Sequence, residues 1–184
     1  MAQITRLDIP DVMVLATKRY PDSRGYFTEL YNAKALADSG IAEPFVQDNL
    51  SLSAKTGTIR GLHFQVPPYS QAKLVRVSKG RILDVAVDIR PASPTFGHHV
   101  AIEISADNGL QIYIPHGFAH GFCTLEPDTE VVYKVTSYYA PQAEGGILWS
   151  DSQLRIDWPV SAENAVVSDK DAVLPVLKEF SSVF

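Results

Sequence analysis

The chain has 184 residues, the size of one domain, so we expect residues 1–184 to fold as a single unit. Apolar residues make up 46% and charged residues 20%, a composition that excludes disordered, collagen-like and membrane-embedded proteins. The 16 Lys and Arg are outnumbered by 21 Asp and Glu. The net charge of −5 argues against a nucleic-acid partner, although it leaves open a local basic pocket for a phosphorylated small molecule.

Apolar and polar residues alternate along most of the chain, which predicts a mainly β protein. Strands are predicted at 12–16, 25–31, 45–53, 58–65, 72–79, 83–89, 100–104, 110–114 and 131–135. A short helix is predicted over 32–40, with Asn32 at its start and Gly40 just past its end, and another near Ser168. The turn residues 107–109, Asp-Asn-Gly, predict a hairpin between their flanking strands. Many short strands are typical of a sandwich, jelly roll or small barrel, which the irregular last quarter would wrap or close.

The ends and the cysteine content bear on location. The N-terminus, MAQITRLDIPD, lacks the apolar core of a signal peptide, and no run approaches the ~20 apolar residues of a membrane-spanning helix. Cys123 is the single cysteine, so no intrachain disulfide can form, which suits a reducing compartment. We therefore expect a cytoplasmic protein without a membrane partner, and a buried, unreactive thiol.

Histidine is scarce, and its positions are informative. His98 and His99 follow a turn and are predicted to lie at a solvated strand end. The segment around His120 matches the P-x-G-x-x-H pattern of the cupin family through Pro115 and Gly117. This resemblance implies a cupin-like jelly-roll barrel with a few short helices.

The metal ligands of a typical cupin are incomplete in this sequence. Where cupins carry H-x-H, this chain has His63-Phe64-Gln65, and no glutamate occurs between Gln65 and Gly80. Lys73 stands in that interval, and its protonated ammonium cannot ligate a cation and would repel one. We expect a barrel that binds no metal, with a metal-dependent cupin as the alternative.

A histidine, a lysine and a tyrosine in one barrel suit proton abstraction beside a carbonyl group. Neutral His63 is a base poised near pH 7, and the Lys73 ammonium can stabilise a developing enolate oxyanion. Tyr133, in an alternating run, can return a proton from a facing strand, although an ordinary core tyrosine is the alternative. Because the carbonyl group itself acidifies the neighbouring C–H, this chemistry requires no cofactor.

A histidine base also needs a carboxylate that orients it. Asp84 and Asp88 occupy one face of an alternating strand and are predicted to be solvated. Asp171 either orients a histidine or completes a helix capping box with Ser168. The sequence leaves this choice open.

Taken together, the motifs of this chain resemble those of the dTDP-4-dehydrorhamnose 3,5-epimerase family, which are metal-free enzymes of the cupin type. The resemblance covers almost the whole chain. It is carried by residues 22–27 with Glu29, 45–49, 59–65, 73–76, 84–90, 93–97, 114–122, 138–141, 144–145 and 170–171.

The resemblance implies a role for each matching residue. His63 would be the general base, paired with Asp171, and Tyr133 the acid on the opposite side of the sugar ring. Lys73 would stabilise the enolate at the C4 oxygen. The implied substrate-binding residues are Arg24, Glu29, Gln47, Asn49, Arg60, His120, Glu144 and Lys170, with Tyr139 stacking on the thymine ring.

The implied reaction inverts C3 and C5 of dTDP-4-dehydro-6-deoxy-D-glucose and yields dTDP-4-dehydro-L-rhamnose, without a cofactor. The family implies a homodimer, in which Arg24 and Glu29 would act on the neighbouring subunit's site. Besides the metal-dependent cupin, two alternatives remain at this point: an epimerase acting at C3 only or C5 only, and a nucleotide-sugar binder without activity. His116 receives no role.

Overall fold

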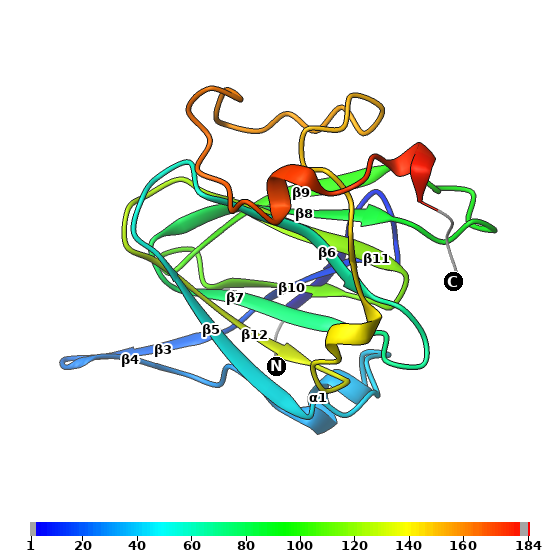
Figure 1. Ribbon diagram of the computed structural model, residues 1–184. Coiled ribbons are helices and arrows are strands. Elements are labelled where there is room, and N and C mark those ends of the chain that lie inside the picture. Colours follow the sequence, from blue (N-terminus) through cyan, green and yellow to red (C-terminus); the bar gives the residue numbers. More distant parts are fainter. Residues whose placement is uncertain (1–2, 181–183) are drawn as a thin grey trace.

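The computed structural model describes residues 3–180 and Phe184, and its strands form two facing antiparallel sheets (Figure 1). The six-stranded sheet contains, in spatial order, β1 (Gln3–Arg6), β2 (Met13–Ala16), β10 (Leu110–Ile114), β7 (Lys73–Lys79), β12 (Thr129–Val135) and β5 (Gln47–Ser53). The five-stranded sheet contains β13 (Glu144–Gly146), β6 (Ile59–Gln65), β11 (Phe118–Thr124), β8 (Arg81–Asp88) and β9 (His99–Ser105).

The main core lies between these sheets. Alternation points every second side chain inward, so Val75 and Ile112 of one sheet meet Ile82 and Phe122 of the other. No strand ladder joins the two sheets within the described part of the chain, so the barrel is an open one. The predicted fold class, mainly β and cupin-like, is confirmed.

Short elements complete the fold. β3 (Arg19–Asp22) and β4 (Gly25–Thr28) form a hairpin that projects from the body of the molecule (Figure 1). Helix α1 (Ala33–Ala37) begins as predicted, because the Asn32 side chain accepts a hydrogen bond from the amide of Ala35. Three 3-10 turns follow later in the chain: η1 (Pro141–Ala143), η2 (Asp171–Val173) and η3 (Leu177–Glu179). Within the described residues, no helix has the length and apolar character that crossing a bilayer requires.

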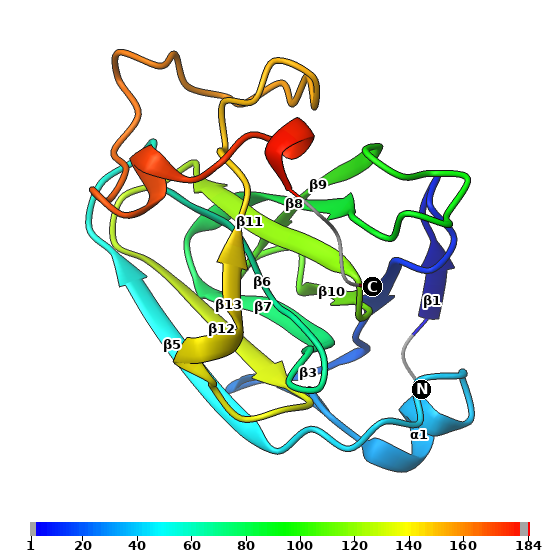
Figure 2. The same ribbon diagram turned by 45° about the vertical axis from the view of Figure 1, so that its right-hand side comes forward.

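The last quarter of the chain covers the outer face of the five-stranded sheet (Figure 2). Leu154 and Leu177 from this segment pack against Val85 and Val87 of β8. Val85 and Val87 on the outer face of β8 are therefore as fully buried as Ile82 and Ala86 on its inner face. This cover brings η2, near the predicted second helix, onto β6 as a single 3-10 turn.

The structure differs from the sequence-based expectations at one turn and at several strands. Residues 107–109 form a turn, but they lead from β9 in one sheet to β10 in the other, so the predicted hairpin pairing is wrong. Strand β11 was not predicted, because all seven of its residues are buried and its pattern does not alternate. The short strands β1, β3 and β13 also carry too little pattern to be predicted.

Candidate active site

A polar cavity between the sheets contains almost all of the predicted site residues. It has two lobes that share His63, Lys73 and Tyr133. The Tyr139 lobe, of about 320 Å³, is lined by those three residues and by Gln47, Asn49, Phe64, Gln65, Gln71, Tyr139 and Glu144. The His120 lobe, of about 310 Å³, adds Ser51, Arg60, His120, Phe122, Ser168, Lys170 and Asp171 to the same three.

His63 on β6 is held by a carboxylate. Its Nε2 lies 2.7 Å from Oδ1 of Asp171, whose other oxygen accepts the amide of Gly61 at 3.3 Å. Burial would raise the pKa of Asp171, but the hydrogen bond from His63 and the amide outweigh it and lower that pKa. An ionised carboxylate only accepts, so Nε2 carries the proton and Nδ1 is left to accept another. The Ser168 Oγ accepts the amide of Asp171, but the Asp171 carboxylate binds His63 and Gly61 rather than the Ser168 amide, so Asp171 orients the histidine and does not complete a capping box.

A second histidine lies beside the first. In the pairing of β6 with β11, His120 stands opposite His63. The strands approach closely because two glycines meet: a Cβ at Gly61, whose φ is +126°, would lie 2.6 Å from Cα of Gly121. The sequence therefore sets the two imidazoles side by side.

Tyr133 approaches from the opposite sheet. It lies on β12, whereas His63 lies on β6, and both side chains line both lobes. Burial raises the pKa of Tyr133, and the charge of Arg60 opposes the shift only in part. The phenol is therefore protonated at neutral pH and available as a proton donor.

Lys73 lies on β7, and its Nζ donates to the main-chain oxygen of His63 at 3.3 Å. Burial lowers the pKa of Lys73 to about 8, against the opposing pull of the Asp84 and Glu144 carboxylates. The ammonium is thus held close to the histidine and is poorly hydrated, which strengthens its action on a nearby anion.

The predicted exposure of Asp84 and Asp88 is wrong, because both are fully buried. Asp84 and Asp88 share the inward face of β8 with Ile82 and Ala86, whereas Leu83, Val85 and Val87 point outward against the last quarter of the chain. Asp84 accepts Nε2 of His120 at 2.9 Å, and its Oδ1 has no hydrogen-bond partner among the described residues. A signal was present in the sequence: apolar residues on both sides of a strand indicate burial of both faces.

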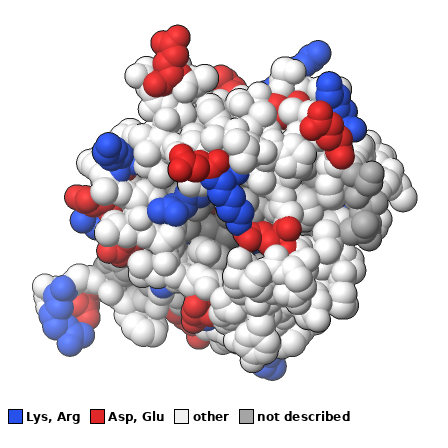
Figure 3. Space-filling model, in the orientation of Figure 1, with Lys and Arg blue, Asp and Glu red and all other residues white. Residues whose placement is uncertain are grey.

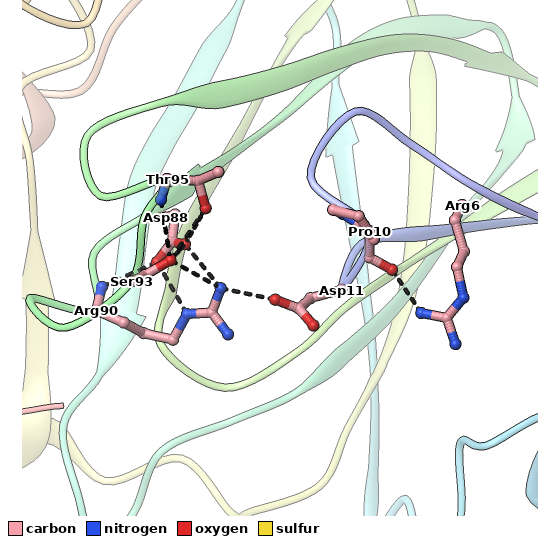
Figure 4. A network of polar contacts seen from close by, with 7 residues as sticks. All are labelled: Arg6, Pro10, Asp11, Asp88, Arg90, Ser93 and Thr95. Carbon is pink, nitrogen blue, oxygen red and sulfur yellow. Dashed lines mark hydrogen bonds and ion pairs between the residues drawn. The ribbon is translucent and has the colours of Figure 1, made fainter.

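The same face of β8 carries two carboxylates with different surroundings. Asp88 accepts hydrogen bonds from Arg90, Ser93 and Thr95, and Arg90 also reaches Asp11 (Figure 4). These bonds outweigh the burial that raises the pKa of Asp88 and lower it to about 2. Asp88 is therefore part of a structural network, whereas Asp84 belongs to the cavity.

His120 is the second orientated imidazole. Burial lowers its pKa, although the Asp84 carboxylate acts in the opposite direction. Because Asp84 accepts the Nε2 proton, neutral His120 offers Nδ1 as an acceptor. It suits a ligand hydroxyl group better than an oxyanion.

A chain of polar groups closes the Tyr139 lobe. The Tyr139 hydroxyl donates to Glu144 at 2.9 Å, and Lys170 forms an ion pair with the same carboxylate at 2.7 Å. Tyr139 itself is 56% exposed, so its side chain remains accessible to a ligand. Charged groups of both signs border a hollow on this face of the molecule (Figure 3).

Two predicted site residues lie outside the cavity of their own chain. Arg24, whose side chain is 86% exposed, pairs with Asp22 in the projecting β3–β4 hairpin. Glu29 is exposed just after that hairpin and lines neither lobe. His98 is exposed as predicted, but His99 is partly buried, and burial lowers its pKa. Cys123 is buried as predicted, and burial raises its pKa to about 11.

The fold and its polar interior place the chain among the cupin-like proteins with a ligand-binding cavity between two sheets. The sequence profile of the dTDP-4-dehydrorhamnose 3,5-epimerase family matches residues 6–179. The chain belongs to this family.

Named relatives agree with the profile. A dTDP-4-dehydrorhamnose 3,5-epimerase of Shigella flexneri is 49% identical over 169 residues, which cover 91% of this chain and 92% of the relative. A crystal structure of dTDP-6-deoxy-D-glucose-3,5-epimerase from Legionella pneumophila, in complex with dTDP-4-keto-L-rhamnose, is 43% identical with a TM-score of 0.93, covering 98% of this chain and 95% of that one. A 3′-monoepimerase of Streptomyces bikiniensis, in complex with dTDP-quinovose, is 30% identical with a TM-score of 0.87, covering 94% and 87%.

Proposed function

We propose that this protein epimerises C3 and C5 of dTDP-4-dehydro-6-deoxy-D-glucose and forms dTDP-4-dehydro-L-rhamnose, as an isomerase of dTDP-rhamnose biosynthesis. The observation that carries the proposal is the placement of two proton-transfer groups on opposite walls. The same cavity is lined by His63 on one sheet and by Tyr133 on the other, and Asp171 holds His63 in place. Inversion needs this arrangement, because the proton must leave one face of the sugar and return to the other.

The proposed reaction proceeds through an enolate. Nδ1 of His63 takes the proton from the carbon beside the C4 ketone. The C–H electron pair forms a double bond to C4, and the carbonyl π pair moves to the C4 oxygen. The Lys73 ammonium stabilises that oxygen. The Tyr133 hydroxyl then protonates the carbon from the opposite face as the enolate returns to the ketone. Imidazolium His63 releases its extra proton to solvent, and the Tyr133 phenolate takes one up. C3 and C5 both lie next to C4, so the same groups serve both centres.

The two lobes divide the proposed substrate. The sugar would lie in the His120 lobe, where His120 accepts a hydroxyl and Arg60 contributes positive charge. The nucleoside would lie in the Tyr139 lobe, where the exposed ring of Tyr139 offers a stacking platform. Arg60 and Lys170, which both line the His120 lobe, are cations suited to the diphosphate that joins the sugar to the nucleoside.

Solvent labelling tests the proposed function. In heavy water, NMR of the product is expected to find deuterium at both C3 and C5. Label at one centre alone would establish a single-centre epimerase instead. That alternative is kept because a 3′-monoepimerase shares this fold.

We further propose a homodimer in which Arg24 and Glu29 complete the partner's site. Two observations support it. Both residues belong to a projecting arm that does not reach the cavity of its own chain. Apolar side chains are exposed on this arm and on β5, including Phe27 at 69% and Leu50 at 62%, and an interface would cover them.

Mixing two inactive variants tests the dimer. Arg24→Ala and His63→Ala are each expected to lose activity as pure dimers. When the two are unfolded and refolded together, the mixed dimer has one intact site, which predicts recovery of about a quarter of wild-type activity. A mixture no more active than its parts would place Arg24 in its own subunit's function. Lys34→Ala, an exposed cation on α1, replaces Arg24→Ala in the control mixture.

We also propose that the enzyme works in the cytoplasm as a single domain, without metal or cofactor. The lysine that stands in the interval of a cupin metal ligand supports this, since its ammonium repels cations. One tightly bound transition metal per chain, together with loss of activity in chelator, would contradict it.

The rate is expected to depend on pH through Lys73. Its pKa of about 8 means that the ammonium is present below that pH and is lost above it. We therefore expect kcat to fall as the pH rises through about 8. Asp84→Asn removes a carboxylate that raises the Lys73 pKa, so the alkaline limb should move to lower pH. The measurement is kcat against pH.

The neighbouring carboxylate Asp88 provides a matched control. It is as buried as Asp84 and lies on the same strand face, but its partners are Arg90 and Ser93 outside the cavity. Asp88→Asn should lower thermal stability and leave the pH limb in place. An unmoved limb in Asp84→Asn would mean that a group other than Lys73 governs it, such as the phenol of Tyr133, which lines the same lobe.

A further inference from the structure

The segment that carries Tyr139 is fastened to the barrel by three glutamine side chains. We call Gln47, Gln65 and Gln71 the glutamine clamp. Together they bind four successive main-chain positions. Gln71 Nε2 donates to the Ser137 oxygen (2.8 Å), Gln65 Nε2 to the Tyr138 oxygen (3.2 Å), the Tyr139 amide to Gln47 Oε1 (3.2 Å) and the Ala140 amide to Gln65 Oε1 (2.8 Å).

Gln65 is the centre of the clamp. It is the last residue of β6, two positions after His63, and only 4% exposed. A primary amide has two N–H groups and one oxygen. In Gln65 the N–H groups face the oxygens of Tyr69, at 2.7 Å, and Tyr138, and its oxygen accepts from Ala140. Main-chain groups thus bind both the amide nitrogen and the amide oxygen of Gln65, although the residue lines the Tyr139 lobe.

The glutamine clamp lies next to Glu144, the residue that binds the hydroxyl of Tyr139. Gln65 stands opposite Glu144 in the pairing of β6 with β13, and Glu144 accepts the Tyr139 hydroxyl. The main chain and the ring tip of Tyr139 are therefore both tied to one short stretch of sheet. Ordering an exposed aromatic side chain before binding removes an entropic cost from the binding step.

We propose that Gln65 is a positioning residue, which holds Tyr139 in the orientation that stacks on the nucleobase of the ligand. The inference deepens the proposed function and rests on it, because it takes the Tyr139 ring as the base platform. Gln65 acts through Tyr139 and does not itself contact the ligand.

A double-mutant cycle with dTDP as the probe tests this role. Gln65→Leu removes all of the clamp bonds of Gln65 without adding charge, and Tyr139→Ala removes the platform. Base stacking on an aromatic ring is worth enough that each single variant should raise the Kd for dTDP about tenfold, measured by calorimetry. Because Gln65 acts through Tyr139, the double variant should bind no more weakly than Tyr139→Ala alone. In Gln65→Leu, KM should rise much more than kcat falls.

Further variants show whether weaker dTDP binding comes from an added charge or from a loss of folding. Gln65→Glu keeps an acceptor for Ala140 and loses the donors, so it should also weaken binding. Gln142→Glu adds the same charge to an exposed position nearby and should bind dTDP as the parent does. If Gln65→Leu does not fold, Gln71→Leu enters the same cycle, since its amide binds the oxygen of Ser137.

The outcomes distinguish two failures. If Tyr139→Ala weakens dTDP binding but the Gln65→Leu effect persists undiminished in the double variant, Gln65 has only a structural role and the inference is wrong. If Tyr139→Ala leaves the Kd for dTDP unchanged, the proposed base platform is wrong, and the role of Gln65 falls with it.

Discussion

Replacing His63 by alanine is expected to lower kcat by about 10²–10⁴-fold or more, while dTDP still binds. In the proposed mechanism the imidazole accepts the carbon-bound proton, and Asp171, 2.7 Å away, fixes its tautomer. His63 also lines the Tyr139 lobe, but the proposed base platform Tyr139 is held by Glu144 and Gln47 and not by the imidazole. Steady-state rates and calorimetry with dTDP measure the two effects separately.

A second histidine provides the control for this experiment. His98 is exposed just before β9 and lines neither lobe, so His98→Ala should turn over as the parent does. If His63→Ala keeps most of its activity, another group removes the proton and the proposed mechanism is wrong. The thermal unfolding midpoint of each variant separates lost chemistry from lost fold.

Replacing Tyr133 by phenylalanine is expected to reduce epimerisation more than it reduces proton exchange. His63 would still remove the proton, but no acid would remain on the opposite wall, so the carbon would be reprotonated mainly from the face that it left. In heavy water, NMR should detect deuterium in recovered substrate faster than product forms. General acid catalysis contributes about 10²–10⁴-fold, which sets the expected loss of product.

The control for Tyr133→Phe is another buried phenol of the same sheet. Tyr113 on β10 is 5% exposed and lines neither lobe. Tyr113→Phe should leave the ratio of exchange to product unchanged. Equal losses of exchange and product in Tyr133→Phe would argue against a dedicated acid and assign the tyrosine a binding role.

Local features of this protein were readable from its sequence. Alternation located most strands to within a few residues, since the side chains of a strand point to opposite faces. Asn32 predicted the start of α1, because capping depends on residues that are near in sequence. His63, Lys73 and Tyr133 were selected by their chemistry and by family resemblance, and the structure brings all three to one cavity.

What alternation does not reveal is what covers each face. The polar face of β8 was predicted to meet solvent, yet Asp84 points into the barrel because the last quarter of the chain covers the other side. The turn at 107–109 was recognised, but its sequence does not say that β9 and β10 enter different sheets.

The sequence alone therefore determined which stretches are strands and which side chains are able to move protons. The family resemblance implied that Asp171, 108 residues away, pairs with His63, and the tertiary structure shows that contact. Only the tertiary structure decided that Asp84 holds His120 and that Gln65 fastens the Tyr139 segment. The physical reason is that secondary structure follows from neighbours along the chain, whereas a partner for a buried polar group is chosen by whichever distant segment packs against it.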